Sequence, residues 1–197
     1  MQILEKRVHS EVNGAYGELM DAFRRLLVNK EFEKISVAEI SKAANVSRKT
    51  FYNYFRDKNE LVEHIVYKNI LLPMKQMRSF SDAFQFPSQT IMSGLYEKFY
   101  EDRVFYKKVS LFTGQNSFFE LMMDYTTVIV EEKFRDLAIS EQEKEYSIYF
   151  YASSHMMVLM KWIRDGMVIT PQQMATFYDK WTIPAIVEYM NEKGNTL

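Results

Sequence analysis

A short basic stretch, residues 47–54, carries closely spaced side chains that can donate hydrogen bonds. If a helix begins after Ser47, successive residues lie about 100° apart. One face then presents only side chains that can donate hydrogen bonds, with no acid among them: Arg48, Lys49, Thr50, Tyr52 and Asn53. Arg and Lys can reach guanine O6 and N7, Asn can bind adenine, and Thr or Tyr can contact thymine methyls or phosphates. The sequence therefore predicts a face that reads base edges in a major groove.

The aromatic rings of the same stretch divide into two groups. Phe51 and Phe55 are four residues apart and share the face opposite the polar one. Val46 precedes the expected cap, in the position where a hydrophobic staple would pair it with Phe51. We therefore expect Phe51 and Phe55 in the core, and Tyr52 and Tyr54 outside.

Residues near helix starts could contact the DNA backbone. Helix N-termini offer free N–H groups to phosphates, and we predict phosphate contacts from Ser36, Ser47, Tyr54 and Lys58. Residues 34–58 hold six cations and two acids, a local charge of +4 in a chain of net charge −1. A basic segment in an otherwise acidic chain indicates contact with a polyanion, although a solvated surface is the common alternative.

The elements that must position these side chains are helices. Apolar residues follow helical spacing nearly throughout, and no stretch shows sustained strand alternation, so we predict an all-α fold. Short helices are expected over residues 37–43 and 48–54, with only residues 44–46 between them, which is the spacing of a helix-turn-helix unit. Asn45 stands where a left-handed turn residue is needed, a conformation that Asn tolerates well.

Capping patterns set further boundaries. Ser36, Ser140 and Thr170 are each followed three residues later by Glu or Gln, as in a capping box, and Asp57 can cap another helix. Gly166 suits the left-handed residue that ends a helix. We expect long helices over residues 141–165 and from 171 to about 190, and a break between helices over residues 80–88.

The segment EKISVAEISKAANVSRKTFYNYFRDKNELV, residues 33–62, resembles the DNA-binding domain of the tetracycline-repressor (TetR/AcrR) family. The shared pattern is a capped helix, a turn ending in Val-Ser, an aromatic-rich recognition helix and F-x-x-K-x-x-L. Two departures concern turns only. The family often has Gly at the position of Asn45, and often Gly at the position of Glu31.

This resemblance implies a homeodomain-like helix-turn-helix domain, assigned to residues 1–58, and a helical effector-binding and dimerisation domain, assigned to residues 59–197. It also implies that the last two long helices pair with those of a second copy. The helix over residues 141–165 is apolar around more than half of its circumference, which favours burial on two sides, although a large monomeric core is the alternative.

A cavity for a small, largely apolar effector is expected in the second domain. Candidate lining residues are aromatic or Met, with one His that could orient a ligand: Met92, Tyr96, Phe99, Phe112, Phe118, Met122, Tyr125 and His155. For each of them, ordinary core packing is the more common role. The sequence names neither the effector nor the operator or target genes.

Other classes of protein have little support. The chain has no Cys, its three His show no metal-ligand spacing, and no nucleophile–base pair or phosphate-binding Gly loop appears. We therefore expect no catalytic residue, metal site or cofactor, and a small helical enzyme is the disfavoured alternative. With no signal peptide and no membrane-spanning stretch, the expected location is cytoplasmic.

These features together predict a DNA-binding transcription regulator. By resemblance it is a homodimeric, ligand-responsive repressor that binds a near-palindromic operator. An activator of the same family, or a regulator that needs a protein partner, stays open as an alternative.

Overall fold

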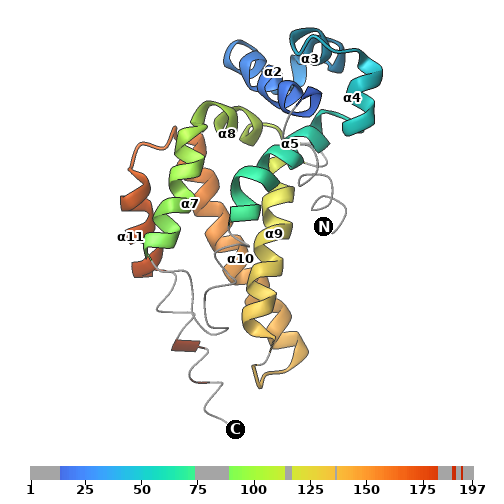
Figure 1. Cartoon of the computed structure of the whole chain (residues 1–197). Coiled ribbons are helices and arrows are strands. Elements are labelled where there is room, and N and C mark those ends of the chain that lie inside the picture. The colour runs from blue at the N-terminus through green and yellow to red at the C-terminus, as the bar shows by residue number, and fades with distance from the viewer. Residues whose placement is uncertain are drawn as a thin grey trace.

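The computed structural model describes residues 14–73, 89–113, 117–135 and 137–181, together with residues 188, 189 and 192. Every regular element within these ranges is helical, as Figure 1 shows, so the predicted all-α class is confirmed. The expected break over residues 80–88 lies outside the described residues, as does most of the expected final helix beyond residue 181.

The N-terminal body consists of α2 (Ala15–Asn29), a 3₁₀ turn (Phe32–Lys34), α3 (Val37–Ala43) and α4 (Arg48–Tyr54). The inner face of α2 buries Tyr16, Leu19, Met20, Ala22, Phe23 and Leu27 at helical spacing. This stripe packs against α3 and α4, and it forms the base on which the helix-turn-helix unit rests.

Side-chain caps set the start of each short helix as predicted. Ser36 and Glu39 form the reciprocal capping box of α3. The Ser47 hydroxyl accepts the Thr50 N–H at the start of α4. Asp57 accepts two backbone N–H groups at the start of α5 (Lys58–Val66). These bonds satisfy amides that would otherwise have no partner within the helix, so each helix begins at a defined residue.

α5 leads out of the N-terminal body and continues into a π-helical turn over Tyr67–Leu71. The second body contains α7 (Gln89–Glu101), α8 (Arg103–Ser110), α9 (Phe118–Phe134), α10 (Glu141–Arg164) and α11 (Pro171–Trp181). α7 pairs closely with α11, and α9 pairs closely with α10 (Figure 1). α10 ends as expected, since Gly166 has a φ of 87°, and Thr170 and Gln173 form the capping box of α11.

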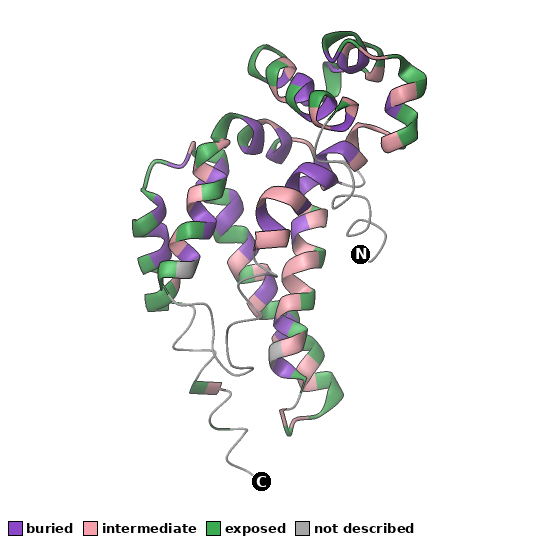
Figure 2. Cartoon of the chain, in the orientation of Figure 1, coloured by how far each residue is buried: buried purple, intermediate pink, exposed green. Residues whose placement is uncertain are grey.

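The buried core runs without a break from the first body into the second. It includes Phe23 and Phe55 at one end, Tyr67 in the π-helical turn (called the wide turn below), and Tyr96 and Met156 at the other end, as the purple segments of Figure 2 indicate. A smaller cluster around Phe134 joins the end of α9 to the start of α10. The boundary predicted between residues 58 and 59 coincides with the first turn of the connecting helix α5, and it stays a prediction.

α8 is a second support for the N-terminal body. The Arg24 Nε atom of α2 donates to Asp102 Oδ2 at 2.7 Å, and the guanidinium lies 5.7 Å from the centroid of the Phe105 ring. Lys108 Nζ lies 2.5 Å from Glu31 Oε1. Glu31 replaces the glycine that is common at this position, and its extended φ of −74° needs no glycine. The acid thus adds an ion pair between the two bodies.

Candidate nucleic-acid interface

A tight turn sets the angle between α3 and α4. Asn45 has a φ of 55°, the left-handed conformation that the sequence predicted. The Asn45 N–H bonds to the Lys42 carbonyl at 3.1 Å, and the Val46 N–H bonds to the Ser41 carbonyl at 2.9 Å. These bonds satisfy the last carbonyls of α3, so α4 leaves the turn in a fixed direction.

The inner face of α4 is anchored by two rings, as predicted. Phe51 and Phe55 are fully buried. Phe55 stacks on Tyr16 of α2, with ring centroids 5.4 Å apart, and meets His64 of α5 edge-on at 5.1 Å. The Tyr16 hydroxyl and His64 Nδ1 are 3.0 Å apart. One aromatic cluster therefore fixes α4 against both α2 and α5.

The outer face of α4 presents the predicted side chains to solvent. Arg48, Lys49, Tyr52 and Asn53 are exposed, and the Tyr52 side chain is 58% accessible. Thr50 is half-buried, and its Oγ1 lies 2.9 Å from the Ser47 hydroxyl. The structure thus brings four of the five proposed base-contacting residues together on one open face. Thr50 stands at its edge with its hydroxyl already engaged.

Tyr54 lies differently from the expectation of an outward ring. It is half-buried, and its ring packs edge-on against Tyr16 at 5.8 Å. The sequence reasoning missed this contact because helical spacing places Tyr54 on the flank of α4 and cannot tell that α2 passes there. A phosphate contact from its hydroxyl stays a prediction.

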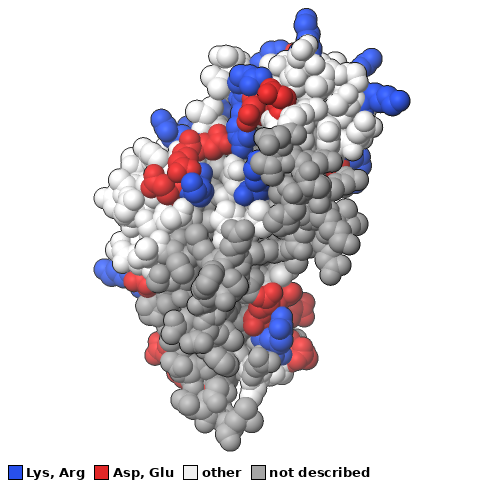
Figure 3. All heavy atoms as spheres, in the orientation of Figure 1, with Lys and Arg blue, Asp and Glu red and all other residues white. Residues whose placement is uncertain are grey.

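The electrostatic environment of the outer face is positive. Lys34, Lys42, Arg48, Lys49 and Arg56 are all exposed, and among the described residues none of the first four has an acid within ion-pair distance. Figure 3 shows Lys and Arg side chains projecting from the outer end of this body, while acids gather along the middle and at the opposite end. Five of the six cations of residues 34–58 are therefore exposed to solvent, and Lys58 is the exception.

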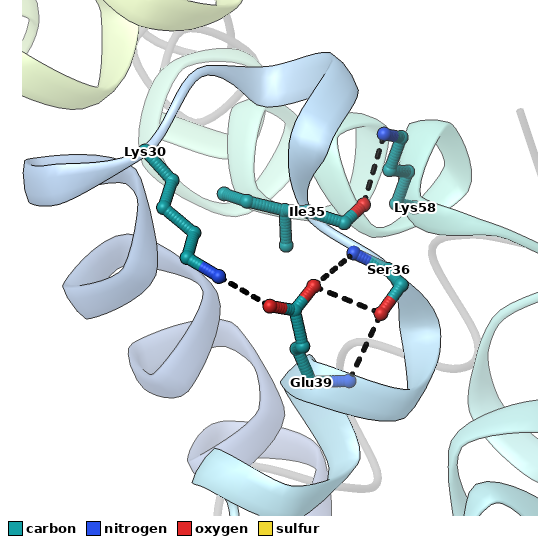
Figure 4. Close-up of polar contacts among 5 residues, drawn as sticks. All are labelled: Lys30, Ile35, Ser36, Glu39 and Lys58. Carbon is teal, nitrogen blue, oxygen red and sulfur yellow. Dashed lines mark hydrogen bonds and ion pairs between the residues drawn. The ribbon is translucent and has the colours of Figure 1, made fainter.

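Three proposed phosphate-contacting residues, Ser36, Ser47 and Lys58, form hydrogen bonds within the protein, and a phosphate contact from Ser47 stays a prediction. The Ser36 hydroxyl donates to Glu39 Oε2 at 2.9 Å and accepts the Glu39 N–H at 3.2 Å (Figure 4). Lys30 pairs with the same carboxylate, and this ammonium together with the Ser36 N–H holds the pKa of Glu39 at about 2. The Glu39 carboxylate of the capping box is therefore ionised at neutral pH.

Lys58 is bound by backbone carbonyls. Its Nζ atom donates to the carbonyls of Phe32, Glu33 and Ile35 at 2.7, 3.1 and 3.0 Å, the last of which Figure 4 shows. The ammonium also lies 4.5 Å from the centroid of the Phe32 ring. Burial lowers the pKa of Lys58. This side chain closes the turn between α2 and α3, and contacts from Ser36 or Lys58 to phosphate stay predictions.

The proposed effector-pocket residues do not all meet. Met92, Tyr96, Phe99, Phe118 and Met122 are buried, whereas Phe112, Tyr125 and His155 are half-buried. Tyr96 and His155 lie together, with ring centroids 6.5 Å apart. Phe112 instead packs against Phe32 of the N-terminal body at 5.0 Å. Sequence reasoning missed Trp162 and Tyr178, which contact the Tyr96–His155 pair and whose aromatic character was the only available signal.

α10 has an unusual outer face. Its inner side buries Ile148, Ala152, Met156 and Leu159. Its outer side leaves four large apolar side chains between 63% and 69% exposed: Tyr146, Tyr149, Phe150 and Met157. Tyr149 also lines a groove of about 750 Å³ between α9 and α10. Exposed apolar surface of this kind marks interaction sites in soluble proteins.

Among the described residues, no three or more His, Cys, Asp or Glu side chains are grouped as a metal site would need. In the same part of the chain, each helix is either too short or too polar to cross a membrane.

Two family models match separate parts of the chain. The family model for bacterial regulatory proteins of the tetR family matches residues 19–65, and a model of a transcriptional regulator C-terminal region matches residues 88–181. The chain is 28% identical over 124 residues to the HTH-type dhaKLM operon transcriptional activator DhaS of Lactococcus lactis subsp. lactis. That alignment covers 63% of this chain and 60% of the relative's length.

Two solved structures share the fold. A dihydroxyacetone kinase operon activator DhaS superimposes with a TM-score of 0.63 at 19% identity, over 89% of this chain and 97% of that one. The tetR-family repressor AlkX from Dietzia sp. superimposes with a TM-score of 0.51 at 14% identity, over 88% and 97%. At these identities the likeness concerns the fold alone.

The buried and the exposed rings of α4 should contribute differently to the stability of the fold. We expect Phe55→Ala to lower the free energy of unfolding by about 3–5 kcal/mol, because it empties a filled core position. Tyr52→Ala should change it by less than about 0.5 kcal/mol, since the ring is largely in solvent. Urea denaturation followed by circular dichroism measures both. Equal costs for the two substitutions would contradict the assignment.

Lys58 should matter for stability more than an ordinary surface cation. Lys58→Met leaves three carbonyls without their charged donor, and we expect a loss of about 1–3 kcal/mol in the free energy of unfolding. Lys42→Met, at an exposed position of α3, is the matched control and should stay within about 0.5 kcal/mol of the parent. If the two variants unfold at the same urea concentration, the carbonyl contacts contribute nothing measurable.

Proposed function

The chain belongs to the tetR family of bacterial regulatory proteins, and on that premise we propose that it binds operator DNA as a homodimer and regulates transcription without catalysis. The observation that carries the proposal is the outer face of α4, where exposed Arg48, Lys49, Tyr52 and Asn53 stand on a helix fixed by buried rings. A role at chromosomal DNA implies a cytoplasmic location.

α4 acts as the recognition helix in this proposal. Its N-terminal residues Arg48 and Lys49 reach guanine edges, while Tyr52 and Asn53 contact bases one turn further along. The cations of the surrounding surface hold the helix in the groove through phosphates. In a dimer, the two recognition helices would contact half-sites about 34–36 Å apart, one turn of the duplex.

The outer face of α10 provides the dimer contact. Its exposed rings and Met157 would be covered by the same face of a second copy, as a two-fold interface requires. This surface belongs to the second body, away from α4, so dimerisation leaves both recognition helices free to reach DNA (Figure 1).

A small effector would act by preferring one arrangement of the two bodies. The bodies are joined by α5 with its wide turn, and by the Arg24–Asp102 and Lys108–Glu31 ion pairs of α8. A ligand that favours the arrangement unable to span two half-sites releases the operator. A difference in affinity of about 1–3 kcal/mol between the two states is enough for such control.

We propose first that the protein represses transcription, since a ligand would release it from its operator. Activation is the second candidate, favoured by the match to DhaS, which is described as an operon activator. The position of the operator separates the two. A footprint that overlaps the promoter supports repression, and a footprint upstream of it with higher transcription in the presence of the protein supports activation.

Base reading by α4 is tested with Arg48→Ala. A duplex is first selected from a random pool by the full-length protein, and the affinities for the selected and a scrambled duplex are compared at one salt concentration. We expect the ratio to fall about tenfold or more, because one base contact contributes about 1–3 kcal/mol. Lys98→Ala, an exposed cation of α7, should leave the ratio unchanged. An unchanged ratio for Arg48→Ala would refute the assigned reading face.

The dimer contact is tested by sedimentation at micromolar concentration. We expect the parent protein to sediment as a dimer and Phe150→Glu to sediment as a monomer, because the charge would be buried at the contact. Tyr52→Glu changes an equally exposed ring on α4 and should remain a dimer. A monomeric parent would remove the proposed dimer.

A further inference from the structure

Three hydrogen-bonding rings from three helices converge in the second body. His155 of α10 meets Tyr178 of α11 edge-on, with centroids 4.9 Å apart, and lies 6.5 Å from Tyr96 of α7. Trp162 closes the inner side, edge-on to Tyr96 at 5.6 Å. We refer to Tyr96, His155 and Tyr178 as the ring cluster.

The hydroxyl of Tyr96 lies at the inner end of the ring cluster. The Tyr96 side chain is fully buried, and its hydroxyl has no hydrogen-bond partner among the described residues. A buried polar group without a partner costs free energy, and native proteins keep few of them unless a ligand, an ion or a water completes the site. The other members of the cluster, His155 and Tyr178, are half-buried.

All three members are uncharged at neutral pH. Burial lowers the pKa of His155 to about 4 and raises the pKa of Tyr178 to about 12. Burial also raises the pKa of Tyr96 well above its usual value, and the neighbouring Tyr178 adds to that shift. The cluster therefore offers neutral hydroxyl and imidazole N–H donors, and a charged ligand group would enter it without an opposite charge.

α11 is the side from which a ligand could enter. Within α11, only Pro171, Met174 and Ala175 are buried. Its polar ties to α7 are exposed side-chain hydrogen bonds, from Gln89 to Thr176 at 2.6 Å and from Gln172 to Glu97 at 3.4 Å. α11 packs closely along α7, but it buries few side chains and its polar bonds to α7 can be replaced by water, so a ligand that reaches the ring cluster would displace α11 before any of the buried helices.

We propose that the ring cluster is a binding site for small uncharged molecules that carry a hydrogen-bond-accepting oxygen on an apolar or aromatic body. The Tyr96 hydroxyl donates to that oxygen, His155 and Tyr178 complete its surroundings, and the Trp162 ring packs against the body of the ligand. The regulatory meaning of the site rests on the proposed function, since α7 leads directly to Asp102 and its ion pair with Arg24.

The test uses probes of one size that differ in charge. Acetophenone and benzyl alcohol are the uncharged probes, and benzoate and benzylamine are the charged ones. Thermal unfolding of the full-length protein is followed at millimolar probe concentrations. We expect an uncharged probe to raise the midpoint and the charged probes to leave it unchanged, because a ligand that binds the native state stabilises it.

Tyr96→Phe removes one hydroxyl and keeps the ring. We expect it to bind the uncharged probe about tenfold more weakly by titration calorimetry, the equivalent of one lost hydrogen bond. Tyr106→Phe changes another fully buried tyrosine, outside the ring cluster, and should bind like the parent. Unchanged affinity in Tyr96→Phe, equal responses to charged and uncharged probes, or no response to either uncharged probe would overturn the proposal.

Operator binding is measured on the same variants, so that failure of the ligand site can be distinguished from failure of the proposed DNA-binding function. Tyr96→Phe should bind the selected duplex like the parent when no probe is present, and should respond less to the probe. If the probe binds but never alters DNA affinity, the site stands and ligand control is lost from the proposed function. If Arg48→Ala keeps full specificity, the reading face fails while the ring cluster is unaffected.

Discussion

A helix of seven residues does not hold its shape alone in water, so α4 depends on the burial of Phe51 and Phe55. Phe55 packs against Tyr16 of α2 and His64 of α5, and Phe51 packs against Phe55. The orientation of every side chain on the outer face follows from this packing. A surface that could read bases is thus a consequence of an aromatic core a few ångströms behind it.

The same core connects the reading face with the second body. α5 carries His64 near its end and continues through the wide turn at Tyr67 into the remaining helices. α2 is held independently by α8, through Arg24 and Asp102. Because both α5 and α8 connect the bodies, the N-terminal body cannot tilt without disturbing packed rings or ion pairs. Such an arrangement favours a few discrete positions over continuous motion, which is what a regulator needs.

The sequence predicted helix caps and tight turns wherever a short pattern fits a single local arrangement. Ser36, Ser47, Asp57 and Thr170 cap helices because a hydroxyl or carboxylate three residues before an amide has an obvious partner. Asn45 adopts the left-handed turn for a similarly local reason. Contacts between segments that are distant in the sequence could not be predicted in this way. Glu31 was interpreted only as a departure at a turn, yet it pairs with Lys108, which lies 77 residues further along the chain.

By itself the sequence determined the all-α class, the helix boundaries near the caps, and the division of α4 into a ring face and a polar face. Helical periodicity and capping act over a few residues, so the sequence displays them directly. Only the tertiary structure decided that Tyr54 packs against α2, that Lys58 binds three carbonyls, and that Phe112 packs against Phe32 of the N-terminal body. It also brought Tyr178 to His155 and Tyr96. The physical reason is that these positions depend on how whole helices pack against one another, which no local pattern records.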